Sequence, residues 1–125
     1  MVAPPTPESR AISLGPADEL PPGSRRVVDV DGRSIGVLNV NGQLYGVRNT
    51  CPHQGGPLCS GVVGGTMVKS EPQEWVVGLE GRVLRCPWHG WEFDLETGRA
   101  LFDGERARVR VYPVSVEDGQ VLLYV

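Results

Sequence analysis

Two short, separated segments hold both histidines and all three cysteines of this chain. The first reads Cys51-Pro52-His53-Gln54-Gly55-Gly56-Pro57-Leu58-Cys59, and the second reads Cys86-Pro87-Trp88-His89-Gly90-Trp91-Glu92-Phe93. Each segment offers one cysteine and one histidine in close order, at C-x-H and C-x-x-H spacing. Two thiolates and two imidazoles from two loops can hold one metal centre between them. The candidate metal ligands are therefore Cys51, His53, Cys86 and His89.

Glycines follow both histidines, as Gly55-Gly56 in the first segment and Gly90 in the second. Glycine adopts φ angles that other residues avoid, which lets a backbone fold tightly around an inorganic centre. Glycine-rich loops also turn several N–H groups toward one point, an arrangement that suits anionic sulfur. A zinc site of Cys₂His₂ type is the alternative. Zinc fingers usually place two cysteines in one knuckle and two histidines in another, so one of each per segment favours an iron–sulfur centre.

The paired segments resemble the loops of the Rieske proteins. That family takes C-x-H from one loop and C-x-x-H from the other to bind a [2Fe–2S] cluster, with two Cys on one iron and two His on the other. The resemblance implies thiolate ligation by Cys51 and Cys86, imidazole ligation by His53 and His89, and one cluster per chain. It extends over residues 10–125 and implies the family's all-β fold, an antiparallel sandwich or barrel base with an inserted cluster-binding β subdomain.

Three departures from the family pattern qualify the resemblance. Respiratory members carry an extra Cys in each loop that bridges the loops, but this chain has Gly56 and Trp88 there, and we expect Cys59 to be a half-buried thiol. High-potential members carry a Ser and a Tyr where this chain has Trp91 and Phe93. Because those hydroxyls stabilise the reduced cluster, we predict a potential near the low end of the Rieske range, about −150 mV.

The third departure is the distance between the loops. The stretch between His53 and Cys86 is about twice as long as in typical members, and the extra length lies within residues 60–81, which resemble an added strand pair. This insertion is expected to cover one side of the cluster, to form a docking edge, or to be a surface hairpin with no role.

Short strands separated by turn signals must position the two loops. Asp31-Gly32, Asn41-Gly42 and Asp118-Gly119 are dipeptides that favour type I′ hairpin turns. The predicted elements are strands over 10–14, 26–30, 34–40, 43–48, 111–116 and 120–125, with one helical turn over 17–20. The predicted divisions are a flexible tail over 1–9, a single domain over 10–125, and a cluster-binding subdomain over about 49–100 with its insertion within 60–81.

Composition narrows the function further. The 125 residues carry 12 Lys and Arg against 15 Asp and Glu, a net charge of −3, which argues against a nucleic-acid partner. No apolar run is long enough for a membrane span, and no secretory signal is present. The odd number of cysteines, three, argues against a secreted disulfide framework and favours the cytoplasm.

Oxygen activation would need a second iron site with two more histidines, and the chain has none to spare. We therefore expect an electron carrier that is not itself an enzyme, passing electrons from a flavin-dependent reductase to a terminal oxygenase in transient encounters. Exposed Gln54, Pro87 and Trp88 would form the docking tip. Glu92, Asp94 and Glu96 would either steer a basic partner or form an ordinary solvated face. The alternatives are a small subunit of a larger reductase, like that of nitrite reductase, and a cluster-bearing sensor or structural module.

Overall fold

The computed structural model describes residues 5, 9–52, 55–69, 75–88, 90–101 and 107–125, with only the backbone for 65–69 and 75–80. Within these residues the chain is all β apart from two short 3₁₀ turns, which confirms the predicted fold class. The strands and turns, in chain order, are β1 (Ala11–Pro16), η1 (Ala17–Glu19), β2 (Arg25–Val30), β3 (Arg33–Val40), β4 (Gln43–Arg48), η2 (Leu58–Ser60), β5 (Val62–Lys69), β6 (Trp75–Arg85), β7 (Glu92–Asp94), β8 (Val111–Tyr112), β9 (Val114–Glu117) and β10 (Gln120–Tyr124).

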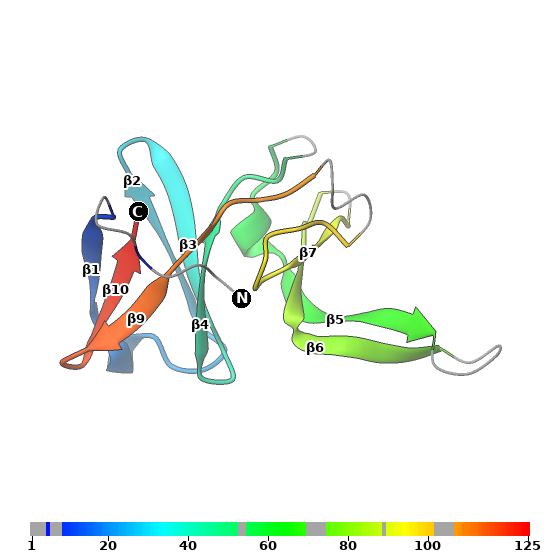
Figure 1. Ribbon diagram of the computed structural model, residues 1–125, viewed down its shortest axis with the longest axis horizontal. Coiled ribbons are helices and arrows are strands. Elements are labelled where there is room, and N and C mark those ends of the chain that lie inside the picture. Colours follow the sequence, from blue (N-terminus) through cyan, green and yellow to red (C-terminus); the bar gives the residue numbers. More distant parts are fainter. Residues whose placement is uncertain (1–4, 6–8, 53–54, 70–74, 89, 102–106) are drawn as a thin grey trace.

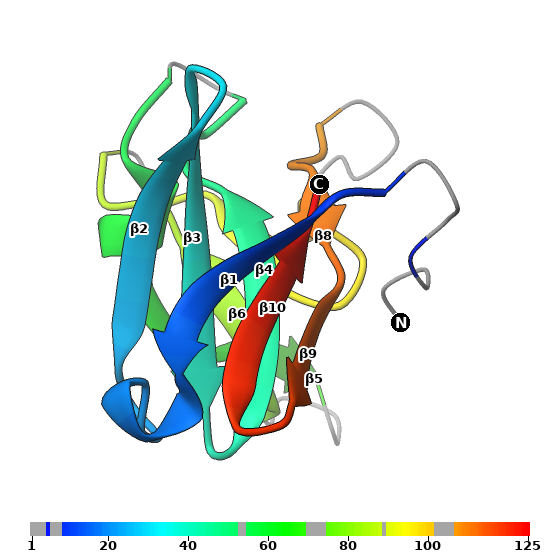
Figure 2. The same cartoon turned by 90° about the vertical axis from the view of Figure 1, so that its left-hand side faces the viewer.

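Three antiparallel sheets form the molecule, in the orders β1-β10-β9, β2-β3-β4-β8 and β5-β6-β7. The second sheet lies in the middle, with β1-β10-β9 on one side and the segment from η2 to β7 on the other (Figure 1). Figure 2 shows β1 and β10 crossing in front of the middle sheet. The first two sheets are the expected base, and the third sheet with the neighbouring loops is the inserted subdomain.

The predicted hairpin turns are present. Asp31, Asn41 and Asp118 have φ angles of 53°, 54° and 51°, and each is followed by a glycine with positive φ. These are the left-handed conformations that a type I′ turn requires. They join β2 to β3, β3 to β4 and β9 to β10, so the turn dipeptides alone located three of the connections.

The predicted strand over 111–116 is wrong in one respect, because the chain changes sheets inside it. β8 pairs with β4, whereas β9 pairs with β10. Pro113 separates them, since it has no N–H to continue a ladder, and its carbonyl accepts a hydrogen bond from Tyr124 N–H at 3.0 Å. The last strand therefore closes the base, while β8 belongs to the middle sheet.

Two apolar cores lie on opposite faces of the middle sheet. Side chains alternate along a strand, so Ile35 and Val37 of β3 enter the core shared with β1 and β10, while Leu38 enters the other. On β4, Tyr45 and Val47 also face the second core. That second core contains the segments that hold the cysteines, so the middle sheet is the support on which the site is built.

The insertion forms the predicted strand pair. β5 and β6 pair antiparallel with a register shift between Gly64 and Thr66, and beyond it they run together away from the loops that join β4 to η2 and β6 to β7 (Figure 1). The described strands of the insertion therefore do not cover those loops. Among the described residues, no helix is long and apolar enough to cross a membrane.

Candidate metal centre

Cys51 and Cys86 lie at the start of two loops that leave different sheets. Cys51 follows β4 after two residues, and Cys86 follows β6 directly. Both side chains are only 2% exposed and belong to one apolar cluster with Leu58, Leu84 and Phe93. The structure thus brings the two predicted thiolate ligands, 35 positions apart in sequence, to the same core.

The two loops share one pattern of backbone hydrogen bonds, which we call the backbone frame. Cys51 N–H donates to the Gly56 carbonyl at 2.9 Å, and Gly55 N–H donates back to the Cys51 carbonyl at 2.8 Å. In the second loop Cys86 N–H donates to the Trp91 carbonyl at 2.8 Å, and Gly90 N–H donates to the Cys86 carbonyl at 3.0 Å. The intervals are the same, five residues and four residues from each cysteine.

A glycine with positive φ closes each frame. Gly55 has φ 78° and Gly90 has φ 74°, and nothing lies within 4 Å of a Cβ added at either position. These glycines are therefore required for their backbone conformation and not for space. The predicted ligands His53 and His89 lie outside the described residues. In sequence, however, each falls between the cysteine and the glycine that close its loop.

The loops meet at Gly56. A Cβ at this buried position would lie 2.9 Å from ring atoms of Trp88 and 3.2 Å from Cys86 Sγ. The backbone of the first loop therefore approaches the thiol of the second at a distance that leaves no room for a side chain. Such a cradle, with a thiol from each loop and a glycine backbone, fits a cluster held between two loops.

No disulfide crosses between the loops, since Cys51, Cys59 and Cys86 are all thiols. At the positions of the family's bridging cysteines, the Trp88 ring contacts Gly56 instead. This contact joins positions 32 residues apart, so it is not apparent from the residue types alone. Trp88 is 56% exposed and Pro87 is also exposed, as predicted for the tip, while Gln54 lies outside the described residues.

Cys59 is more buried than the sequence suggested. It is 1% exposed, its N–H donates to Asn49 Oδ1 at 2.7 Å, and its thiol donates to the Val47 carbonyl at 3.6 Å. Burial raises the pKa of this thiol to about 11. A Cβ on Gly36 would lie 2.4 Å from its Sγ, so Gly36 and Cys59 are packed as a pair. The half-buried prediction is corrected, and Cys59 is a protonated core residue.

Trp91 and Phe93 provide no hydroxyl, as the sequence shows, and they pack into the core beside the cysteines. Phe93 is 1% exposed, and Trp91 is partly buried against the same cluster. Their ring centroids are 6.4 Å apart at a tilt of 32°. Aromatic packing therefore occupies the positions where high-potential members carry hydroxyl groups.

The predicted acidic steering surface is wrong at one of its three positions. Asp94 is buried, and its carboxylate accepts two hydrogen bonds from Arg82, at 3.0 Å from Nε and 2.8 Å from a terminal nitrogen. Arg85 pairs with Glu92 at 2.9 Å, and Arg82 also lies 3.8 Å from Glu96. Two arginines of β6 thus offset most of the charge of the three carboxylates. The register of β6 with β7 is not readable from the sequence.

The pKa of Asp94 reflects this pairing. Burial by itself would raise the pKa, but hydrogen bonds from Arg82 and from the Glu96 N–H outweigh burial and hold the pKa below its usual value. Asp94 therefore remains ionised inside the fold, where it joins the strands on either side of the second loop.

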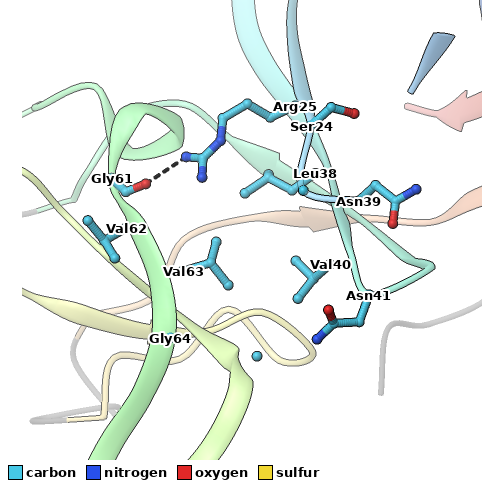
Figure 3. A pocket seen from close by; sticks show the side chains of 12 residues that line it. Ser24, Arg25, Leu38, Asn39, Val40, Asn41, Gly61, Val62, Val63 and Gly64 are labelled. Atoms are coloured by element: carbon cyan, nitrogen blue, oxygen red, sulfur yellow. Dashed lines mark hydrogen bonds between the residues drawn. The ribbon is translucent and has the colours of Figure 1, made fainter. Parts of the chain in front are cut away.

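A separate cavity of about 420 Å³ lies between β3 and the start of β5 (Figure 3). Leu38, Val40 and Val63 line it, and neither Cys51 nor Cys86 does. Arg25 closes one end by donating to the carbonyls of Cys59 and Gly61 at 2.7 and 2.6 Å. This side chain ties β2 to η2, so it fixes the subdomain against the base and is not part of the metal centre.

Comparison with known proteins agrees with this site. A family model described as the Rieske [2Fe-2S] domain matches residues 11–113. The ferredoxin component of naphthalene 1,2-dioxygenase/salicylate 5-hydroxylase systems from Ralstonia sp. is 31% identical over 106 residues, which is 85% of this chain and 86% of the relative.

Solved structures have the same fold. A complex of reduced oxygenase and oxidized ferredoxin in carbazole 1,9a-dioxygenase contains a chain with TM-score 0.69 and 26% identity, covering 90% of this chain and 91% of the other. A Mycobacterium tuberculosis protein, assigned as the small subunit of an NADH-dependent nitrite reductase, has TM-score 0.72 at 23% identity, covering 94% and 96%. That second likeness concerns the fold alone.

These matches decide between the two metal centres that the sequence left open. The matched family binds a [2Fe–2S] cluster, so the zinc alternative is set aside. The ferredoxin relatives are electron-transfer components and not catalysts in their own right. This chain therefore belongs to the Rieske [2Fe–2S] family and is an electron carrier of its ferredoxin type.

Proposed function

We propose that this protein accepts single electrons from a flavin-dependent reductase and passes them to a terminal oxygenase through transient encounters. The observation that carries the proposal is the pair of equivalent loops, each of which begins at a buried cysteine. The likeness to ferredoxin components of dioxygenase systems supports the oxygenase as acceptor. The flavin-dependent reductase follows from the need for a one-electron donor, since flavins can release electrons singly.

Four residues are proposed as cluster ligands. Cys51 and Cys86 bind one iron as thiolates, and His53 and His89 bind the other through their imidazoles. The shared backbone frame supports this assignment, because each frame begins at a cysteine and spans one histidine in sequence. When bound, the cluster supplies reversible one-electron chemistry. The protein's part is to hold the cluster against the apolar core that contains Cys51 and Cys86, and to leave Trp88 at the surface.

The proposal includes a low reduction potential, about −150 mV. Buried Phe93 and partly buried Trp91 support it, because apolar rings next to the cluster do not stabilise the additional negative charge of the reduced state. We also propose that the domain spans residues 10–125 and that the protein works in the cytoplasm, where its cysteines stay reduced.

Electron paramagnetic resonance of the purified protein, before and after reduction with dithionite, tests the cluster. We expect a signal only after reduction, with the low average g value of a histidine-ligated [2Fe–2S] centre, and its loss in His53→Ala and His89→Ala. Cys59→Ala is the matched control and should retain the signal, because that thiol is a core residue. A colourless protein with stoichiometric zinc would overturn the iron–sulfur cluster and, with it, the electron-transfer function.

Electron delivery needs a separate measurement. The dithionite-reduced protein is mixed with the oxidised oxygenase of the same host in a stopped-flow instrument, and reoxidation of the cluster is followed by absorbance. We expect reoxidation that becomes faster with oxygenase concentration. A stable complex that co-purifies with a large reductase, without such reoxidation, would favour the subunit alternative.

A further inference from the structure

Arg25 and Arg26 are neighbours at the start of β2, but they lie on opposite faces of the middle sheet. Arg25 pairs in register with Leu38, which belongs to the core that contains the cysteines, and Arg26 pairs with Val37, which belongs to the other core. Cross-strand partners in register share a face of a sheet. Arg26 accordingly donates to the Leu14 carbonyl of β1, whereas Arg25 reaches the subdomain.

One nitrogen of Arg25 makes both contacts with the subdomain. This terminal nitrogen donates to the Cys59 carbonyl at 2.7 Å and to the Gly61 carbonyl at 2.6 Å, and Figure 3 shows the bond to Gly61. Because the donor is a cation, each bond is stronger than a bond between neutral groups. The two carbonyls lie on either side of Ser60, so a single point of the base holds the end of η2.

The η2 turn is connected to the first loop. The Cys59 N–H donates to Asn49 Oδ1 at 2.7 Å, and Asn49 lies two residues before Cys51. The Gly61 N–H donates to the Leu58 carbonyl at 2.9 Å, which closes the turn on itself. Leu58 also belongs to the same buried cluster as Cys51. A displacement of η2 would therefore displace the start of the first loop.

The same turn lies against the start of the second loop. A Cβ added at Gly61 would lie 1.8 Å from the Arg85 carbonyl oxygen. The φ angle of Gly61 is −78°, so glycine is required at this position for space and not for its conformation. Arg85 directly precedes Cys86, and it pairs in register with Val62, the residue after Gly61. The position of η2 therefore also fixes the residue before Cys86.

We infer that Arg25 is a positioning residue for the metal centre, because it holds the two cysteine loops at a fixed separation through η2. It acts through the backbone of this turn, whose carbonyls it binds. The part of the inference that concerns the cluster rests on the proposed function. A cluster with ligands from two loops requires that the loops keep their separation. Loss of the Arg25 contacts should therefore allow the loops to part more often and release the cluster faster.

The test variant is Arg25→Met, which keeps a long side chain and removes its donors. The matched control is Arg26→Met, which changes the net charge equally and also loses a contact from an arginine to a backbone carbonyl. Both arginines are exposed, so both variants should fold. Release of iron from the cluster-loaded protein to a chelator is followed by absorbance. We expect release about tenfold faster in Arg25→Met and within about twofold of the wild type in Arg26→Met.

Hydrogen exchange of the same proteins, measured by mass spectrometry, locates the change. In Arg25→Met we expect faster exchange in peptides that cover residues 51–61 and 82–92, and in Arg26→Met only in peptides that cover β1. The reduced-state paramagnetic signal should be broader in Arg25→Met alone, since the loops then adopt a wider range of separations. Equal iron release in the two variants, or faster exchange in only one of the two loops, would overturn the inference.

Two rescue experiments separate positioning from a general loss of stability. Arg25→Lys keeps a cationic donor and should restore most of the slow release. In Arg25→Ala, guanidinium ion at a non-denaturing concentration should slow the release, because the cavity of about 420 Å³ beside Arg25 gives it room. Urea, which has a similar shape without the charge, is the control. Failure of both lysine and guanidinium to slow the release would overturn the role of the Arg25 donors.

These measurements also distinguish the inference from the proposed function. Binding of zinc in place of the cluster would count against the proposed function. The exchange difference between Arg25→Met and Arg26→Met would still decide whether η2 couples the two loops, because it is read from the backbone. Unchanged exchange in both loops of Arg25→Met would overturn the inference whichever metal is bound.

Discussion

The two loops of the metal centre have the same backbone frame but are closed at their bases by different chemistry. The ends of the first loop are joined by a neutral contact, in which Asn49 accepts the N–H of Cys59 and donates to Ser34 Oγ at 3.1 Å. The ends of the second are joined by the ion pairs Arg82–Asp94 and Arg85–Glu92.

This difference separates what a cluster loop requires from what it allows. The required part is the frame that each cysteine makes with the residues four and five positions later. The polar contacts around this frame differ between the two loops. Their charge and their dependence on pH can therefore vary without a change in the frame. The following predictions test this distinction, beginning with the largest expected effect.

Replacement of Gly56 should damage the centre most. In Gly56→Val the side chain would meet the Trp88 ring and Cys86 Sγ, and we expect a loss of about 3 kcal/mol in the free energy of unfolding, together with loss of most bound iron. Iron content per chain and urea unfolding measure the two effects.

The rescue variant is Gly56→Val with Trp88→Ala, which removes the ring from the contact. It should recover part of the iron content. Full iron content in Gly56→Val alone would show that the loops do not meet as described.

Removal of the ion pair between Arg82 and Asp94, which joins the ends of the second loop, should have the next largest effect. In Arg82→Met the buried Asp94 carboxylate loses its arginine partner. We expect the free energy of unfolding to fall by about 2 kcal/mol at pH 7, a moderate value because Arg82 is itself partly exposed. Because pairing lowers the pKa of Asp94, this stabilisation is complete above the usual carboxyl pKa and is lost as the pH falls through the lowered value.

Urea unfolding as a function of pH tests this sign. The difference between wild type and Arg82→Met should shrink below about pH 4. The Asn49 hydrogen bonds at the ends of the first loop provide the control. Asn49→Ala should lower the free energy of unfolding by about 1 kcal/mol at every pH. A pH-independent deficit in Arg82→Met would contradict an ionised Asp94.

Gly55→Ala and Gly90→Ala should behave alike, because both glycines have positive φ and open space around them. We expect each to lower the free energy of unfolding by about 1 kcal/mol without loss of iron. Thermal unfolding with iron analysis measures both quantities. Unequal effects of the two substitutions would show that the common frame does not govern the loops equally.

The smallest expected effect concerns the potential. Phe93→Tyr would introduce a hydroxyl at a buried position beside the cysteines, and one hydrogen bond to a sulfur should raise the midpoint potential by about 40 mV. Redox titration monitored by paramagnetic resonance measures this shift. Phe93→Leu is the control without a hydroxyl, and an equal rise in that variant would contradict the assigned cause.

The sequence was most informative where a local rule decides the structure. Strand β4 was predicted at its observed bounds, and turn dipeptides such as Asn41-Gly42 located the hairpins. The family resemblance located the cysteines in two loops. These features depend on a few neighbouring residues, so they are visible without knowledge of the pairing.

The features that could not be predicted from the sequence depend on strand register. The exchange of sheets at Pro113, the Arg82–Asp94 pair and the contact of Gly36 with Cys59 join residues that are distant in sequence. A one-residue change in register would reverse the side that each residue faces. Residue types alone therefore suggested an acidic surface at Asp94 where the fold has a buried ion pair.

The contact between Trp88 and Gly56 has a consequence for maturation. Where some relatives fasten the two loops by a covalent bond, this chain uses an aromatic ring resting on a glycine. This packing contact can break and re-form without an oxidant or an exchange of thiols, and reductants leave it intact. Insertion of the cluster and its replacement after damage then involve no making or breaking of a disulfide between the loops.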